Sequence, residues 1–90
     1  MMADVIQIRV LTHEGIVAEA RAMSVVAPGE PGAIGFLRNH APLVTTLSSG
    51  RLWWRTPEGA EETMMIGDGL LEIVRNRLTI LTSSAAKRVT

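Results

Sequence analysis

The 90-residue chain contains no cysteine and a single lysine, Lys87. Without cysteine, disulfide bonds, thiol catalysis and thiolate metal sites are excluded. No apolar run approaches the roughly 20 residues that a membrane-spanning helix requires. The first four residues, MMAD, form neither the basic segment nor the apolar segment of a secretory signal. These absences predict a cytoplasmic protein.

Aromatic residues and net charge are also scarce. Nine Lys and Arg balance nine Asp and Glu, so no overall field attracts nucleic acid or an anionic membrane. Only Phe36, Trp53 and Trp54 are aromatic, which is too few for a base-stacking surface. Adjacent residues of a strand point to opposite faces, so we expect one tryptophan in the core and the other exposed as a protein contact. We therefore expect no nucleic-acid partner.

Residues suited to catalysis are few. His13 and His40 lie in turn-like segments without metal-ligand spacing, and no serine has the surroundings of a nucleophile elbow. Gly29, Gly32 and Gly35 are not followed by Gly-Lys-Ser/Thr and do not open a helix, so they favour turns over a phosphate loop. A lipoyl or biotinyl carrier is excluded because no predicted hairpin contains a lysine. We expect no catalytic, metal or cofactor-binding residue.

Hydrophobicity alternates with a period of two, as in Ile6, Ile8 and Val10 against Gln7 and Arg9. The pattern predicts strands over residues 5–11, 16–22, 23–27, 33–37, 43–47, 50–56, 61–66, 70–74 and 78–81. Two prolines and two glycines in residues 28–32 are expected to end the strand before them. The chain is thus predicted to be all-β, with about eight to ten short strands in a β-sandwich or flattened barrel and minimal helix.

One domain is expected over residues 1–83, followed by a short tail over residues 84–90. Residues 84–89 have some helical character but are too few for a helix that is stable alone. No linker, repeat or low-complexity segment divides the chain.

Two segments together resemble the N-terminal β-sandwich domain of the F-type ATP synthase epsilon subunit. Residues 32–45 read GAIGFLRNHAPLVT, similar to the family's stretch that ends in His-Ala-Pro-Leu. Residues 69–73 read GLLEI and residues 76–81 read NRLTIL, similar to its Gly-x-Leu-Glu-Val and Asn-x-Val-Thr-x-Leu. The resemblance covers nearly the whole chain.

The chain departs from the family pattern at several positions. Ala33 stands where the family commonly has an acidic residue, and Glu30 is the nearby carboxylate that could replace it. Asn39 occupies the place of a glycine, and asparagine is the residue that best tolerates a left-handed backbone after glycine. Asp68 replaces the first residue of a Gly-Gly pair. Family members usually continue into two C-terminal helices, and we expect this chain to be a naturally short form.

The resemblance implies a central-stalk subunit without catalytic activity of its own. It would couple rotation of the membrane c ring, through the gamma subunit, to ATP synthesis in the catalytic head. The subunit would lie at the cytoplasmic face of the bacterial inner membrane, and it would be attached there only through the complex. A generic β-sandwich adaptor or small-ligand-binding module is the alternative, and the identity of the partners would separate the two.

The resemblance also assigns residues by position. Gamma-facing candidates are Thr12, His40 and Thr45, and His40 has the alternative of a hydrogen bond to a neighbouring carbonyl in its turn. The candidates for the turn facing the c ring are Gly29, Glu30, Pro31, Gly32 and Ala33. Structural turn positions are Asn39, Ala41, Pro42, Asp68 and Gly69.

Overall fold

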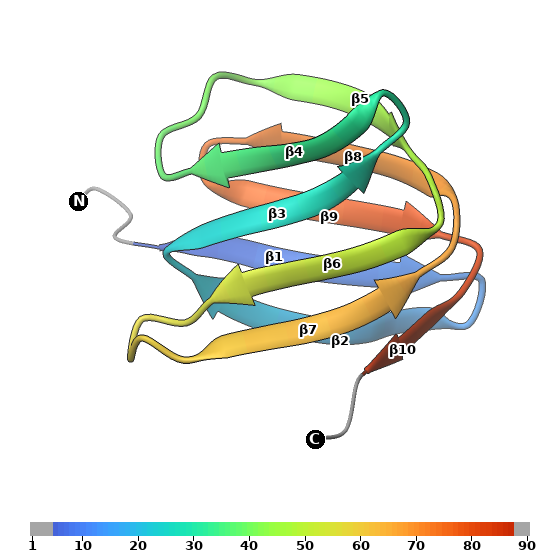
Figure 1. The fold of residues 1–90 in the computed structure, drawn as a ribbon, viewed down its shortest axis with the longest axis horizontal. Helices are drawn as coiled ribbons and strands as arrows, with labels where there is room; N and C mark the ends of the chain where they lie inside the picture. The colour runs from blue at the N-terminus through green and yellow to red at the C-terminus, as the bar shows by residue number, and fades with distance from the viewer. Residues whose placement is uncertain (1–4, 88–90) are drawn as a thin grey trace.

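The fold is all-β, as the alternating pattern predicts. A computed structural model describes residues 5–87, which contain ten strands and no helix (Figure 1). The strands are β1 (Ile6–Thr12), β2 (Gly15–Ala22), β3 (Ser24–Gly29), β4 (Gly32–Leu37), β5 (Leu43–Leu47), β6 (Gly50–Arg55), β7 (Glu61–Ile66), β8 (Gly69–Val74), β9 (Arg77–Thr82) and β10 (Ala85–Lys87). Within the described residues there is no helix that could span a membrane.

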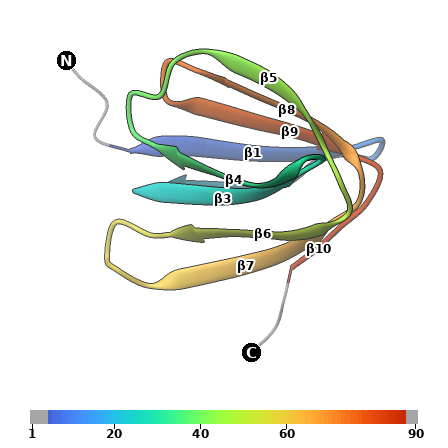
Figure 2. The same cartoon turned by 45° about the horizontal axis from the view of Figure 1, so that its top comes forward.

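The strands form two layers that face each other (Figure 2). The first layer has the order β10-β7-β6-β3-β4, and the second has the order β5-β8-β9-β1-β2. All neighbouring strands are antiparallel except β1 and β9, which are parallel. One residue pair, Gly29 with Leu47, joins β3 to β5 and so links the two layers.

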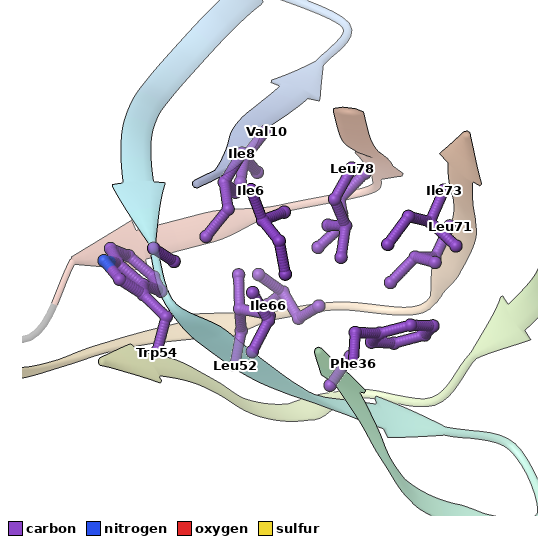
Figure 3. Packing of buried hydrophobic residues seen from close by; sticks show 14 of the residues in the cluster. Ile6, Ile8, Val10, Phe36, Leu52, Trp54, Ile66, Leu71, Ile73 and Leu78 are labelled. Atoms are coloured by element: carbon purple, nitrogen blue, oxygen red, sulfur yellow. The ribbon is translucent and has the colours of Figure 1, made fainter. Parts of the chain in front are cut away.

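The core lies between the layers because every second residue of each strand points inward. Phe36, Leu52, Trp54 and Ile66 contribute from the first layer and face buried residues of the second layer (Figure 3). These opposing side chains are Ile6, Ile8, Val10, Leu71, Ile73 and Leu78. Trp54 is 2% exposed, which confirms that one tryptophan lies in the core, whereas Trp53 on the outer face is half-buried rather than exposed. Burial of this apolar surface is the main stabilising contribution.

The strand before residues 28–32 ends within this segment, as expected, but at Gly29 and so two residues later than predicted. Strand β3 continues through Pro28 to Gly29, and Gly29 pairs with Gly32, the first residue of β4. Pro28 takes part through its carbonyl, which accepts a hydrogen bond from the Ser48 amide (2.8 Å). Only two residues, Glu30 and Pro31, form the turn. Proline therefore contributes its acceptor to this strand although it has no amide hydrogen to donate.

The expected tail begins with a further strand. Residues Ala85 and Ala86 of β10 pair with Ile66 and Met65 of β7, so residues 85–87 extend the first layer. Thr82 supports this ending, because its buried hydroxyl lies within hydrogen-bond distance of the carbonyls of Gly67 (2.8 Å) and Ser84 (3.1 Å). Residues 1–4 of the predicted domain and residues 88–90 of the predicted tail lie outside the described residues.

Candidate functional site

Five turns gather at one end of the sandwich, on the right in Figure 1. They comprise residues 13–14, 30–31, 48–49, 67–68 and 83–84. Glu14, Glu30 and Asp68 lie in these turns, whereas none of the turn positions holds lysine or arginine. We call this the acidic end. Its surface favours contact with a basic partner.

The predicted ring-facing turn is part of the acidic end and is fixed to β5. The Thr46 hydroxyl donates to a carboxylate oxygen of Glu30 (2.9 Å), and the Glu30 amide donates to the Thr46 carbonyl (3.2 Å). A Cβ on the buried Gly29 would lie 2.7 Å from the Gly32 carbonyl oxygen, which only glycine avoids. Ala33 follows on β4 and is exposed. Glu30 is thus the residue that presents a carboxylate at the tip of this turn.

The connection between β4 and β5, residues 38–42, lies at the opposite end and contains the His-Ala-Pro segment. Asn39 has a left-handed φ of 66°, and its amide donates to Oδ1 of Asn76 (2.6 Å). Asn76, also left-handed at 62°, returns a bond from Nδ2 to Oδ1 of Asn39 (3.0 Å). Asn76 is 7% exposed. These reciprocal bonds fasten the connection to the β8–β9 hairpin.

The ring of His40 is held within its own turn. Its Nδ1 lies 2.6 Å from the carbonyl oxygen of Ala41, and its ring packs edge-on against Phe36 at a centroid distance of 5.1 Å. A carbonyl only accepts hydrogen bonds, so Nδ1 is the donor in this contact. A hydrogen bond from His40 to a neighbouring carbonyl is the alternative to a gamma contact that the sequence left open. Ala41 and Pro42 are exposed beside it.

The three gamma-facing candidates do not form one cluster. Thr45 lies on β5 and His40 just before β5, whereas Thr12 ends β1, three strands away across β8 and β9. At about 4.8 Å between neighbouring strands, β5 and β1 are about 14 Å apart. Thr12 accepts a hydrogen bond at Oγ1 from the Glu14 amide (3.2 Å) and so also shapes its turn. A partner that contacts all three residues would have to cover much of the second layer.

The Asp68–Gly69 turn is shaped by close packing. A Cβ on Gly69 would collide with the backbone carbonyl of Leu81, so the approach of β8 to β9 requires glycine here. Asp68 is exposed, and its carbonyl accepts a hydrogen bond from the Ser83 amide (3.1 Å). Among residues 5–87, no three His, Asp or Glu side chains are grouped to hold a metal ion.

One surface was not predicted from the sequence. A hollow of about 530 Å³ lies on the outer face of the second layer, over β8, β9, β1 and β2. Its lining includes Gln7, Arg21 and Arg77, which are far apart along the chain and are brought together only by strand pairing. No local motif signals this grouping, because it depends on the register of three strands.

Comparison with known proteins defines the class to which this fold belongs. The family described as "ATP synthase, Delta/Epsilon chain, beta-sandwich domain" matches residues 5–88. Because this match covers nearly the whole chain, the protein belongs to that family.

Individual relatives are named ATP synthase epsilon chain. The protein of Carboxydothermus hydrogenoformans is 42% identical over 86 residues, which are 96% of this chain and 63% of the relative. That of Acidithiobacillus ferridurans is 44% identical over 87 residues, with 96% of this chain and 60% of the relative covered. That of Rickettsia typhi is 33% identical, with 93% and 78% covered. The chain spans less than two thirds of the length of the first two.

Solved structures share the fold. A chain of the Euglena gracilis mitochondrial ATP synthase, in an assembly of OSCP, F1 and c-ring, superposes with a TM-score of 0.86 at 17% identity. The match covers 97% of this chain and 56% of that one. A chain from the central stalk and c-ring of the Tetrahymena thermophila enzyme gives 0.74 at 11% identity, with 97% and 69% covered. At these identities the likeness shows a common β-sandwich.

Proposed function

We propose that this chain acts as an epsilon subunit of an F-type ATP synthase. In this role it binds gamma in the central stalk and rests on the c ring, so that ring rotation is coupled to ATP synthesis in the catalytic head. The family match over residues 5–88 carries the proposal and favours it over a generic adaptor or small-ligand module. The subunit performs no bond chemistry itself. It is peripheral to the membrane, at the cytoplasmic face of the bacterial inner membrane, through the complex alone.

The architecture suits an element that transmits torque. Two layers packed face to face over a close-packed core deform little under load. The acidic end offers carboxylates on short turns, and Glu30 is braced on β5 by two hydrogen bonds to Thr46. A rigid turn bearing a negative charge favours contact with a positively charged surface, which we propose the loops of the ring provide. We infer that Glu30 makes this contact and that Ala33 lies beside it.

The gamma contact is tested at His40. In His40→Glu a carboxylate replaces a side chain proposed to lie in the interface, so affinity for purified gamma should fall by about 1–3 kcal/mol, roughly 5- to 150-fold. The matched control is Met65→Glu, which adds the same charge at an exposed position on β7 of the first layer. Calorimetric titration measures both. Equal affinities for the two variants would remove His40 from the interface and leave it as a turn residue.

The ring contact is tested by charge reversal at Glu30. Glu30→Lys should weaken binding of the gamma–epsilon complex to c rings in vesicles and reduce proton-driven ATP synthesis. Glu58→Lys is the control, because Glu58 is an exposed turn carboxylate between β6 and β7 at the opposite end. If Glu58→Lys is as harmful as Glu30→Lys, the effect comes from overall charge and the proposed orientation is wrong.

A further inference from the structure

The hollow on the outer face of the second layer places two arginines around one amide side chain. Gln7 on β1 is paired with Arg21 on β2 and with Arg77 on β9. Residues directly opposite each other on paired strands point to the same face of a sheet. Two spacings of about 4.8 Å put the two arginine backbones about 10 Å apart with Gln7 between them. Both guanidinium groups can reach a single group bound above Gln7.

The positive charges of Arg21 and Arg77 are not balanced by ion pairs within the protein. Two other arginines have acidic partners: Arg9, which lines the same hollow, pairs with Glu19 (3.3 Å), and Arg51 pairs with Glu61 (3.1 Å). Within residues 5–87, by contrast, neither Arg21 nor Arg77 has an acidic group within 4.0 Å. The same hollow contains Glu72, which pairs with Thr79 and so stands diagonally across from Arg77 without forming an ion pair. Two adjacent positive charges therefore face solvent without a counter-ion.

We propose that Arg21, Gln7 and Arg77 form a binding site for a phosphate group, either free or carried by a nucleotide. Guanidinium groups bind phosphate oxygens in bidentate fashion, and the Gln7 amide adds a donor between them. A phosphate carries a charge between −1.5 and −2 near neutral pH, which matches two arginines. A carboxylate, with a single charge, would leave one of them unbalanced.

The surroundings suit such a ligand. All three side chains project from paired strands, so their backbones are held in place before the ligand arrives. A volume of about 530 Å³ is within the usual range for small-molecule sites and exceeds what a lone phosphate fills. Phosphate and nucleotides are the reactants of an ATP synthase, so both are present where this chain is proposed to act.

The test is an amide NMR titration of the 90-residue chain with inorganic phosphate and, separately, with ADP at constant low ionic strength. Saturable shifts are expected at residues 7, 21 and 77. Arg21→Gln and Arg77→Gln should each weaken binding at least tenfold, because each removes one charged bidentate donor. Glu72→Gln should strengthen binding severalfold because it removes an opposing charge. ADP binding that is tighter than phosphate binding, with added shifts at Val74 and Thr79, would identify a nucleotide site, whereas equal affinities would identify a free-phosphate site.

The control variant is Arg51→Gln, which loses the same charge from the first layer and should bind phosphate within twofold of the unchanged chain. An equal loss in Arg51→Gln and Arg77→Gln would mean diffuse attraction and would overturn the proposal. Saturation by acetate with the affinity of phosphate, or no saturable shift up to tens of millimolar phosphate, would also overturn it. Arg21, Arg77 and Glu72 are exposed, so these variants should keep the thermal stability of the unchanged chain.

Discussion

At Asn76, two substitutions can separate the contribution of backbone conformation to stability from the contribution of side-chain hydrogen bonds. Its side chain exchanges two bonds with Asn39, and its φ of 62° lies in the left-handed region. Asn76→Gly keeps the conformation and loses both side-chain bonds. Asn76→Ala loses the bonds and also places a Cβ in a conformation that disfavours it. Comparing the two variants isolates the conformational contribution.

The expected losses follow from this geometry. Two hydrogen bonds at about 0.5–1.5 kcal/mol each give a loss of about 1–2 kcal/mol for Asn76→Gly, since water can reach the exposed Asn39 amide and replace part of the bonding. The left-handed conformation costs alanine about 1–2 kcal/mol, and the greater freedom of unfolded glycine offsets about half of that difference. Asn76→Ala should therefore be about 0.5–1 kcal/mol less stable than Asn76→Gly.

Urea unfolding followed by tryptophan fluorescence measures both variants, because Trp54 is buried in the core. With a slope of about 1 kcal/mol/M for a domain of this size, the midpoint should fall by about 1–2 M for glycine and by about 0.5–1 M more for alanine. A cycle with Asn39→Gly, which keeps the left-handed φ at that position too, should show a coupling of about 0.5–1.5 kcal/mol. If alanine at position 76 is as stable as glycine, the conformational part of this reasoning is refuted.

Two further substitutions probe the acidic end. Thr82→Val should lower the free energy of unfolding by about 1–3 kcal/mol because it leaves the buried carbonyl of Gly67 without its donor, whereas Thr82→Ser keeps the hydroxyl and should lose less. Calorimetric melting measures both variants, and equal losses would assign the effect to packing. Gly69→Ala should lower the free energy of unfolding by about 1–3 kcal/mol because β9 would have to move away from the added Cβ. Gly35→Ala is the control and should be close to neutral, because no atom lies within 4 Å of its added Cβ. Similar melting temperatures for the two variants would contradict the close approach of β8 to β9.

Most of the fold could be predicted from local pattern. Strand interiors such as Ile6, Ile8 and Val10 are visible as a period of two because one face of each strand is buried. The turn between β3 and β4 was predicted, but Pro28, Gly29 and Gly32 were wrongly included in it. Proline and glycine are general strand breakers, and only the structure of the hairpin shows that Pro28 is needed as an acceptor alone. Strand β10 was also missed, because three residues that pair only at the edge of β7 carry too little periodicity to be recognised.

The candidate site was less accessible to sequence reasoning. The resemblance pointed to His40 and to the turn around Glu30, but the brace from Thr46 depends on the contact of β5 with that turn. Arg21 and Arg77 look like ordinary solvated charges on their own strands. Their relation to Gln7 arises from two registers, one antiparallel and one parallel, and a shift of either by one residue would send the arginine to the opposite face.

The parallel pairing of β1 with β9 sets the order in which the chain can fold during synthesis. Gln7 is paired with Arg77, so β1, once it has left the ribosome, has only β2 as a paired neighbour until β9 has been made. Until then β9 is missing between β8 and β1, so Ile6, Ile8 and Val10 lack the buried neighbours Leu78 and Ile80, although most of the first layer opposite them has already been made. Pairing between strands so far apart in the sequence is slow, and the intermediates that form before it are prone to aggregation. Nascent chains arrested before residue 77 should therefore engage chaperones and be degraded, whereas release of residues 77–82 should trigger closure of the second layer.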